Sequence, residues 1–364
     1  MIRVLFACRP QIFSIPGGDT VQLLKLKDYL SPLGVKAVIA PDPCAESPEL
    51  ADLVHLFNLF DVNSTRSHLR QARQHGLPTV ITPNYWNPLD FFFHPSPSPL
   101  HRLFRAVFPH QAAASLYVGH KRRRMKAELD AQREILTATR IILPNSLEEA
   151  LILQQDFDQP ADKFSVVYNA VDIDNIDSAT PDVFAEKYGV KDFVLCAGRF
   201  EERKNQLGVA TELAGIEVPV VFIGGVPACH RSYFAACRQA AANIPHVLLL
   251  EGLPQQEIFS AMKSAKVHIL GSWWENTGLV SLEAAVCGCN VVTTNRAPWR
   301  EYFADDVWVC DPADPGSIRS ATEAALRAPT RQALPVRIRE KFTWTLSAQA
   351  LKQAYESVLQ APGL

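Results

Sequence analysis

The chain has 364 residues, 48% of them hydrophobic and 20% charged, which is the composition of an ordinary soluble globular protein. This length exceeds one typical domain and predicts two. A net charge of −2 and a pI near 6.6 argue against a nucleic-acid-binding protein. The sequence also has no run of about 18 apolar residues that would predict a membrane span.

The eight cysteines are scattered along the chain and include no C-x2-C pair. A zinc site is therefore not predicted, and buried reduced thiols are the better interpretation. Cys287 and Cys289 form the one close pair, and their place at a predicted helix end favours packing over a redox role. The first residues lead straight into a strand-like run without the pattern of a signal peptide, so we expect a cytoplasmic protein.

Short β-rich segments alternate with helical patterns through the first half of the chain. A glycine pair, Gly17-Gly18, follows the first of these segments, and an amphipathic helix is predicted over 21–33. Such alternation predicts βα units around a parallel sheet. The predicted strands of this first series are 4–7, 35–40, 53–57, 78–82, 141–144 and 165–168.

A second, similar series of strands begins at Phe193, after turn-forming residues at 169–172 and Pro181. We therefore expect the α/β fold class, with two Rossmann-like doubly wound domains at 1–170 and 171–341 and a closing helix within 342–364. Ligands of such sheets bind at the carboxyl ends of strands, so a site in an interdomain cleft is expected. The predicted strands of the second series are 193–198, 218–225, 247–250, 267–270 and 290–294.

One segment, 86–126, breaks this alternation. It combines aromatic and aliphatic residues and a proline cluster with the cationic run 120–126. Such a composition suits an element that binds an acceptor or lies on a membrane surface. An irregular packed insertion, whose basic run is a solvated helix start, is an equally good interpretation.

Two glutamates, Glu275 and Glu283, stand eight residues apart just after a predicted strand of the second domain. Asn276 or Thr277 can cap a helix that Gly288 ends. This helix is apolar nearly all round, so it is predicted to be buried. A buried carboxylate at Glu283 is costly unless something hydrogen-bonds to it.

The start of that helix has unpaired N–H groups and the positive end of the helix dipole, both of which suit a phosphate. Glu283 would lie about 9 Å along the axis from Thr277, at about 1.5 Å per residue. One ligand can therefore contact Glu275, place phosphates on the amides of residues 276–279 and reach Glu283 with hydroxyl groups. For a random E-x7-E spacing a solvated surface glutamate is commoner, but the strand–cap–helix context favours a ligand site here.

Two cations, Arg199 and Lys204, follow the first strand of the second domain. At the carboxyl end of a strand they can clamp a diphosphate and stabilise the charge that it gains as a leaving group. Alone, the charged run 201–204 is more often a solvated surface. In the same domain as the glutamate pair, the diphosphate interpretation is favoured.

The remaining candidates are weaker. Gly17 and Gly18 allow close approach of a ligand or form a plain tight turn, and without G-x-G-x-x-G a nicotinamide enzyme is disfavoured. His55, at a strand end, is more often a structural histidine than a catalyst. Asn84 opens a segment that lines a cleft or packs as a loop. Ser146 lacks a G-x-S-x-G setting, so no hydrolase triad is predicted.

Together these residues resemble family 4 of the retaining GT-B glycosyltransferases over nearly the whole chain. Glu275 and Glu283 match its E-x7-E motif, and Arg199 with Lys204 match its G-R…K pair. The combination is specific, although either motif alone is weak. The other matches are Gly17-Gly18 as a loop near donor and acceptor, 169–172 as the N-G-V-D stretch at the domain junction, and 342–344 with Tyr355 as a helix that crosses back to the N-terminal domain.

The resemblance implies a nucleotide-sugar donor and transfer with retention, in which the leaving phosphate helps to take the acceptor proton. Glu275 would hold sugar hydroxyls near the reacting carbon, and Glu283 would bind the ribose hydroxyls. Arg199 and Lys204 would supply the positive charge, so neither a metal nor another cofactor is expected. The amides expected to meet the sugar and the phosphates are those of Asn276, Thr277, Gly278 and Leu279.

Two positions depart from the family pattern. Pro83-Asn84 stands where many relatives carry a histidine-aspartate pair, so Asn84 is the expected substitute as a hydrogen-bonding group. Asn205 replaces the usual glycine after the lysine, which is a common variant.

The sequence thus predicts a retaining, metal-independent hexosyltransferase of bacterial surface polysaccharide synthesis, acting on a glycan or lipid-linked glycan. We expect a cytoplasmic protein with a possible peripheral contact to the inner membrane surface through 86–126, and no nucleic-acid partner. Two alternatives stay open. A nucleotide-sugar epimerase of the same fold would turn over donor without acceptor, and a non-catalytic nucleotide-sugar-binding partner would bind donor without turnover.

Overall fold

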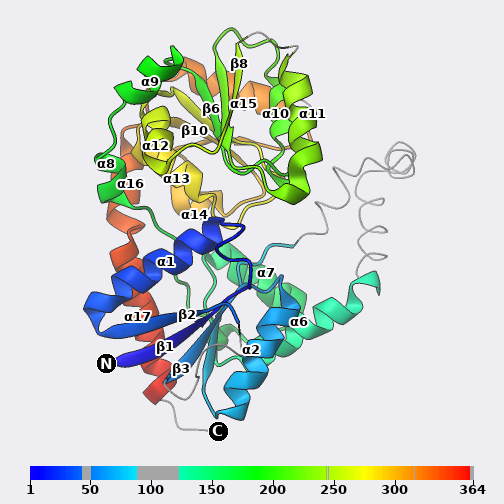
Figure 1. Ribbon diagram of the computed structural model, residues 1–364, viewed down its shortest axis with the longest axis vertical. Coiled ribbons are helices and arrows are strands. Elements are labelled where there is room, and N and C mark those ends of the chain that lie inside the picture. The colour runs from blue at the N-terminus through cyan, green and yellow to red at the C-terminus, as the bar shows by residue number, and fades with distance from the viewer. Residues whose placement is uncertain (43–50, 88–122, 243, 245, 315, 361–364) are drawn as a thin grey trace. The chain divides into compact units, whose positions relative to one another are not determined.

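The computed structural model describes residues 1–42, 51–87, 123–242, 244, 246–314 and 316–360, which form two compact units. The first unit comprises Met1–Asn169 with Trp344–Leu364, and the second comprises Ala170–Thr343. The chain therefore leaves the first unit inside the turn-rich stretch 169–172 and rejoins it at the closing helix (Figure 1). Most of the aromatic and basic segment 86–126 lies outside the described residues.

The first unit is built on a parallel sheet, whose described strands follow the order β2-β1-β3-β4-β5. Parallel neighbours need crossover connections, and helices supply them here. Helix α1 packs against α17, and α2 packs against α6. The strands are β1 (Ile2–Ala7), β2 (Val35–Ala40), β3 (Leu53–Phe57), β4 (Thr79–Thr82) and β5 (Ile141–Ile142). The main helices are α1 (Gly18–Leu30), α2 (Val62–Gln74), α6 (Lys126–Ala138), α7 (Leu147–Phe157) and α17 (Trp344–Gln360).

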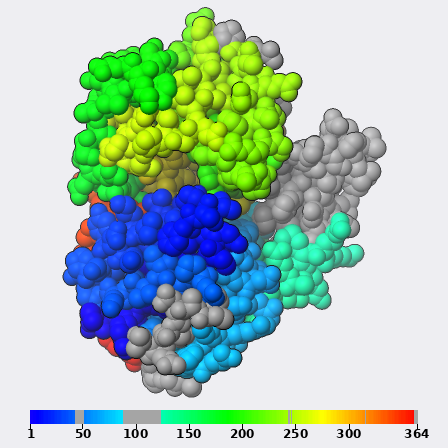
Figure 2. Space-filling view, in the orientation of Figure 1, coloured from blue at the N-terminus to red at the C-terminus, as the bar shows by residue number. Residues whose placement is uncertain are grey.

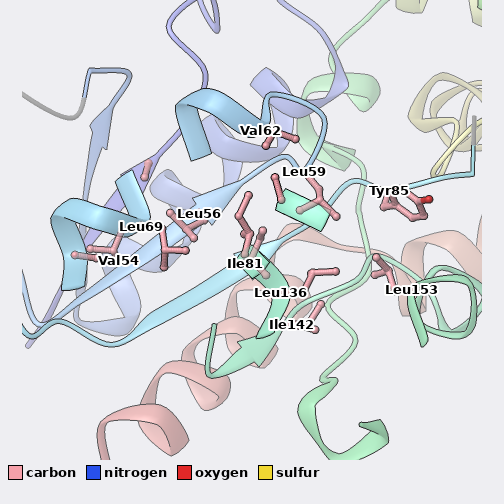
Figure 3. Close-up of a cluster of buried hydrophobic side chains, with 14 of the residues drawn as sticks. Val54, Leu56, Leu59, Val62, Leu69, Ile81, Tyr85, Leu136, Ile142 and Leu153 are labelled. Atoms are coloured by element: carbon pink, nitrogen blue, oxygen red, sulfur yellow. The ribbon is translucent and has the colours of Figure 1, made fainter. Parts of the chain in front are cut away.

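The core of the first unit lies between this sheet and the helices α2, α6 and α7 (Figure 3). Every residue of β3 and of β4 is buried, as expected for a parallel sheet covered on both faces. The side chains that meet in this core include Val54, Leu56, Leu69, Ile81, Leu136, Ile142 and Leu153.

A polar contact fixes the closing helix to the first unit. His55, on β3, is fully buried, and its Nδ1 lies 2.6 Å from the hydroxyl oxygen of Tyr355 on α17. Its Nε2 lies 2.8 Å from Oγ1 of Thr82. Burial lowers the pKa of His55 to about 3, so the ring is neutral at physiological pH. His55 lies in the middle of β3 and not at a strand end as predicted, but its buried and hydrogen-bonded ring is that of a structural histidine, the commoner interpretation from the sequence.

The second unit is also built on a parallel sheet, with the described strands in the order β11-β10-β9-β6-β7-β8. Its first strand, β6, therefore lies beside its fourth, β9, as in the doubly wound nucleotide-binding sheet. The strand order reverses between β6 and β9, and ligands of such sheets bind outside the carboxyl ends of the two strands at this switch point. The strands are β6 (Val194–Ala197), β7 (Val220–Gly224), β8 (Val247–Glu251), β9 (Val267–Leu270), β10 (Asn290–Thr294) and β11 (Trp308–Cys310).

Helices alternate with these strands along the chain. The expected fold class of two parallel-sheet α/β domains is confirmed. The helices of the second unit are α8 (Ile173–Asp177), α9 (Asp182–Tyr188), α10 (Gln206–Glu212), α11 (Arg231–Ala242), α12 (Gln255–Ser264), α13 (Leu279–Val286), α14 (Trp299–Phe303), α15 (Ser317–Arg327) and α16 (Ala333–Lys341).

Two predicted elements of the first unit differ from the structure. The strand predicted over 165–168 is wrong, because the pairing with β5 stays an isolated bridge between Ile142 and Phe164, although the amides of Ser165 and Val167 donate to the carbonyls of Ile142 and Pro144. Its neighbour Pro144 has no N–H with which to continue a ladder. The helix predicted over 21–33 begins at Gly18 and turns into a short 3-10 helix at Ser31–Leu33, where Pro32 cannot continue the α-helical bonds.

The burial of the closing helix and of the cysteines follows the sequence only in part. Leu351 and Tyr355 lie on the buried face of this helix, whereas Leu346 and Leu359 are 43% and 38% exposed. Ala348 and Val358 also lie on the buried face of the helix, which begins at Trp344. The prediction of buried cysteines holds for most of the described ones, whereas Cys229 is exposed and Cys287 is partly exposed.

Candidate active site

The loops that follow β6 and β9 meet at the switch point of the second sheet. The loop after β6 runs from Gly198 to Asn205, and the loop after β9 runs from Gly271 to Gly278. Asn205 has φ +57, a left-handed conformation that glycine or asparagine tolerates, which explains why asparagine can replace the usual glycine here. Its Nδ2 donates to the carbonyl of Gly271 at 3.0 Å. Asn205 thus ties the two loops together.

Lys204 and Glu275 form the centre of this site. The Nζ of Lys204 lies 2.6 Å from Oε1 of Glu275. The side chain of Lys204 is 13% exposed and that of Glu275 is 7% exposed, so the ion pair is largely shielded from water. The structure therefore brings together two of the residues that the sequence assigned to donor binding.

Arg203 is a second cationic partner of Glu275. Its Nη1 lies 3.1 Å from Oε1 of Glu275, and its Nη2 lies 2.6 Å from Oε1 of Glu201. By contrast, the Nη2 of Arg199 lies 3.3 Å from Oε2 of Glu201, and the side chain of Arg199 is 30% exposed. The site thus alternates cations and carboxylates, with Arg199 at its more exposed end.

The charges of this cluster control its protonation. Burial would raise the pKa of Glu275, but the neighbouring Lys204 and Arg203 outweigh it and hold the pKa at about 2. Burial lowers the pKa of Lys204, and Glu275 offsets part of that change. Burial also works against the charge of Glu201, yet Arg203, Arg199 and Lys204 lower its pKa. Glu275 is therefore ionised at any physiological pH and cannot serve as a proton donor.

The helix that carries Glu283 begins later than predicted. Gly278, with φ +71, is its N-cap, and neither Asn276 nor Thr277 caps it. A left-handed N-cap favours glycine, and a Cβ at Gly278 would also crowd the side chain of Leu270. The amides of Leu279 and Val280 stand at the start of α13, where intrahelical partners are lacking, and can bind an anion, whereas the amide of Ser281 already donates to the carbonyl of Gly278 at 2.8 Å.

Glu283 lies on α13 and is partly exposed, whereas Leu282 and Ala284 beside it are buried. Burial, with a smaller contribution from Asp172, raises the pKa of Glu283 to about 8. The prediction of a fully buried Glu283 is wrong, because the residue is partly exposed. The raised pKa nevertheless agrees with the expected cost of ionising this carboxylate. Hydroxyl donors of a ligand would relieve that strain.

The remaining predicted site residues belong to the first unit. Gly17 caps α1, and the N-terminal segment before it (dark blue in Figure 2) reaches the surface. Phe13 in this segment is 55% exposed. Asn84 has φ +50, and its Oδ1 accepts a bond of 2.8 Å from Nδ2 of Asn145. Its Nδ2 lies 3.3 Å from Oε1 of Gln22. The amide of Asn84 is therefore engaged by two neighbours in this structure.

Sequence reasoning did not identify Arg203 or Glu201 as site residues. Both stand in the run 201–204, which resembles a solvated charged surface, yet Glu201 is only 8% exposed. The position of this run at the carboxyl end of a buried strand was the available signal. Within the described residues, no group of three or more histidine, cysteine or carboxylate side chains could hold a metal ion. Of the described helices, none is both long and apolar enough to cross a bilayer.

The candidate site lies within a stretch of the chain that is similar to known proteins. Residues 182–341 match the family model described as Glycosyl transferases group 1. They include the loops after β6 and β9 and the helix α13. A Campylobacter jejuni protein, N-acetylgalactosamine-N,N'-diacetylbacillosaminyl-diphospho-undecaprenol 4-alpha-N-acetylgalactosaminyltransferase, is 28% identical over 169 residues, which are 46% of this chain and 44% of that protein. The chain thus matches less than half the length of this relative.

Solved structures resemble the chain over nearly its full length. Sucrose-phosphate synthase from Thermosynechococcus elongatus aligns over 100% of both chains, with a TM-score of 0.77 and 15% identity. Anabaena HepE, in complex with UDP-glucose, aligns over 98% of this chain and 100% of its own, with a TM-score of 0.72 and 16% identity. A glycosyltransferase from Rickettsia africae aligns over 99% of both chains, with a TM-score of 0.71 and 13% identity. At these identities the likeness shows the fold, which is the GT-B fold of glycosyltransferases.

Proposed function

We propose that this protein is a retaining glycosyltransferase that moves a hexose-type sugar from a nucleotide-sugar donor to a glycan or lipid-linked glycan acceptor. The observation that carries the proposal is the contact of 2.6 Å between Lys204 and Glu275 at the switch point of the second sheet. It joins the G-R…K loop and the E-x7-E loop within the region that matches the Glycosyl transferases group 1 model. A chance occurrence of both motifs would not place them on neighbouring strands.

In the proposed complex the donor diphosphate lies against Arg199 and Lys204 and on the amides of residues 276–279. Glu275 holds hydroxyls of the sugar, and Glu283 accepts hydrogen bonds from the ribose. The bond between the anomeric carbon and the diphosphate oxygen breaks, and the acceptor oxygen forms its bond on the same face. The leaving diphosphate takes the proton of the acceptor hydroxyl, while Arg199 and Lys204 stabilise its negative charge without a metal ion.

The acceptor assignment has separate support. The curated relative is named for transfer to a sugar on diphospho-undecaprenol, which is a lipid-linked acceptor. We extend that class of acceptor to this chain and place its action in bacterial surface polysaccharide synthesis. The proposed reaction would run in the cytoplasm with peripheral contact to the inner membrane surface. The segment 86–126, to which we assigned that contact, lies largely outside the described residues.

The decisive experiment is a screen of UDP-, GDP- and dTDP-sugars with the purified protein, with and without undecaprenyl-diphosphate-linked sugars. Hydrolysis or transfer from one donor, with NMR showing that the anomeric configuration is retained, supports the proposal. Lys204→Ala should remove the activity, whereas Arg327→Met, which changes an exposed side chain of α15, should not. Interconversion of donors without acceptor would indicate an epimerase. Binding without turnover would indicate a non-catalytic partner, and neither binding nor turnover would refute the proposal.

A further inference from the structure

Arg203 makes contacts with both loops of the candidate site. Its Nη1 donates to the carbonyl of Trp274 at 2.9 Å, and its own carbonyl accepts from the amide of Trp273 at 2.8 Å. Its guanidinium carbon lies 4.6 Å from the centre of the Trp274 ring, in cation–π geometry. With the ion pairs to Glu201 and Glu275, these contacts fix the planar guanidinium in one orientation.

Lys204 differs from Arg203 in the chemistry of its side chain. In the described structure its ammonium bonds to Glu275, but the lysine side chain is a flexible stem with a compact charge. In the proposed reaction this ammonium must meet the diphosphate as its charge grows. Any movement of Lys204 towards the diphosphate weakens its bond to Glu275. A carboxylate that is 7% exposed would then face a large desolvation cost unless another cation stayed beside it.

We propose that Arg203 is a positioning residue that keeps Glu275 ionised and oriented towards the donor sugar while Lys204 binds the leaving diphosphate. The inference rests on the proposed function for the identity of the ligand. The two adjacent cations then have different roles. Lys204 binds the leaving diphosphate, and Arg203 keeps the carboxylate of Glu275 in place. Arg203 acts through Glu275 and touches neither the sugar nor the diphosphate.

This division of tasks predicts a specific kinetic result for Arg203→Met, which keeps much of the side-chain bulk and removes the charge. With UDP-glucose, UDP-N-acetylglucosamine and GDP-mannose as probes, kcat for the active donor should fall about 10²-fold, the loss typical of a displaced reacting group. The Kd of the matching free nucleoside diphosphate should stay at the wild-type value. Arg203→Lys should recover part of kcat, and Arg327→Met is the matched control on an exposed arginine.

The pH profile separates this role from a merely structural one. In the wild-type protein Glu275 stays ionised throughout the usual assay range. Without Arg203 the pKa of Glu275 should rise, so kcat of Arg203→Met should show an acid limb that Arg203→Lys and the wild-type protein lack. A loss of nucleoside diphosphate affinity equal to the loss of kcat, with no acid limb, would overturn the proposal, because Arg203 would then bind the diphosphate itself.

A stability measurement tests the contact without any donor. Urea unfolding of Arg203→Met, Glu275→Gln and the double variant gives the coupling between the two side chains. Non-additive effects support the proposal, and additive effects overturn it. If the wild-type protein turns over no donor in the screen, the proposed glycosyltransferase function fails, whereas this coupling still decides whether Arg203 maintains Glu275.

Discussion

Lys204 and Glu275 lie 71 positions apart in the chain, yet their charged atoms are 2.6 Å apart at the carboxyl ends of β6 and β9. In the described structure the two side chains form an ion pair, and both are largely buried. A donor diphosphate that binds beside them competes for the ammonium of Lys204. We therefore expect both the affinity for the proposed donor and the rate of the proposed transfer to depend on this ion pair.

Lys204→Ala should lower kcat more strongly than Glu283→Ala does. In the proposed complex Lys204 meets charge that develops on the leaving diphosphate, and removal of one such group costs about 10²–10³-fold in kcat. In the proposed complex Glu283 binds ribose hydroxyls equally in the ground state and the transition state, so its loss should mainly raise KM. Steady-state kinetics with the donor found in the screen measures both. Equal losses confined to KM in both variants would contradict these roles.

Glu283→Gln should make the stability of the protein less dependent on pH. The pKa of Glu283 is raised to about 8, so the folded protein holds a proton that the unfolded chain releases. The stabilising contribution of the protonated group is full below the ordinary glutamate pKa of 4.5 and is lost as the pH rises towards 8.

Urea unfolding at pH 5, 7 and 9 tests this linkage. Between pH 5 and pH 9 the wild-type protein should lose on the order of 2 kcal/mol that Glu283→Gln retains, since each pKa unit corresponds to about 1.4 kcal/mol and part of the side chain is solvated. Glu186→Gln, at an exposed position of α9, is the control. Identical pH dependence in all three proteins would show that Glu283 is not electrostatically strained.

Tyr355→Phe should destabilise the first unit without altering the second. The change removes the hydroxyl that contacts Nδ1 of His55 and leaves a fully buried ring nitrogen without that partner. The expected loss is about 1–3 kcal/mol in the free energy of unfolding. Denaturation followed by circular dichroism measures it, with Leu359→Ala as the control at an exposed position of the same helix. An unchanged unfolding midpoint would show that the contact does not hold α17 in place.

Gly224→Ala should displace the loop after β6. A Cβ atom at Gly224, the last residue of β7, would collide with the carbonyl group of Gly198, which is backbone and cannot rotate away. We expect a loss of about 1–3 kcal/mol from overpacking and weaker binding of the nucleoside diphosphate. Gly225→Ala is the matched control, since a Cβ there meets nothing within 4 Å. If Gly224→Ala kept the wild-type stability and the wild-type affinity for the nucleoside diphosphate, Gly224 would not need to lie so close to the carbonyl of Gly198.

The architecture was predictable because its signals are local. Buried parallel strands produce short apolar runs, and crossover helices separate them at regular intervals, so the two series of strands were visible without a structure. The E-x7-E spacing and the pair of Arg199 and Lys204 were visible for the same reason. The strand predicted over 165–168 failed because pairing depends on a neighbour, and Pro144 in that neighbour has no N–H to offer.

The sequence by itself therefore determined the α/β class, the two domains and the residues that carry the motifs, since each depends on neighbours within about 20 positions. The tertiary structure decided which charges meet. The loops after β6 and β9 lie side by side because the strand order reverses between those two strands. That reversal brings Arg203 to Glu275 and leaves Glu201 8% exposed within a run that resembles a solvated surface. Contacts between residues some 70 positions apart have no local signature, so Arg203 became a candidate only when the two loops were seen together.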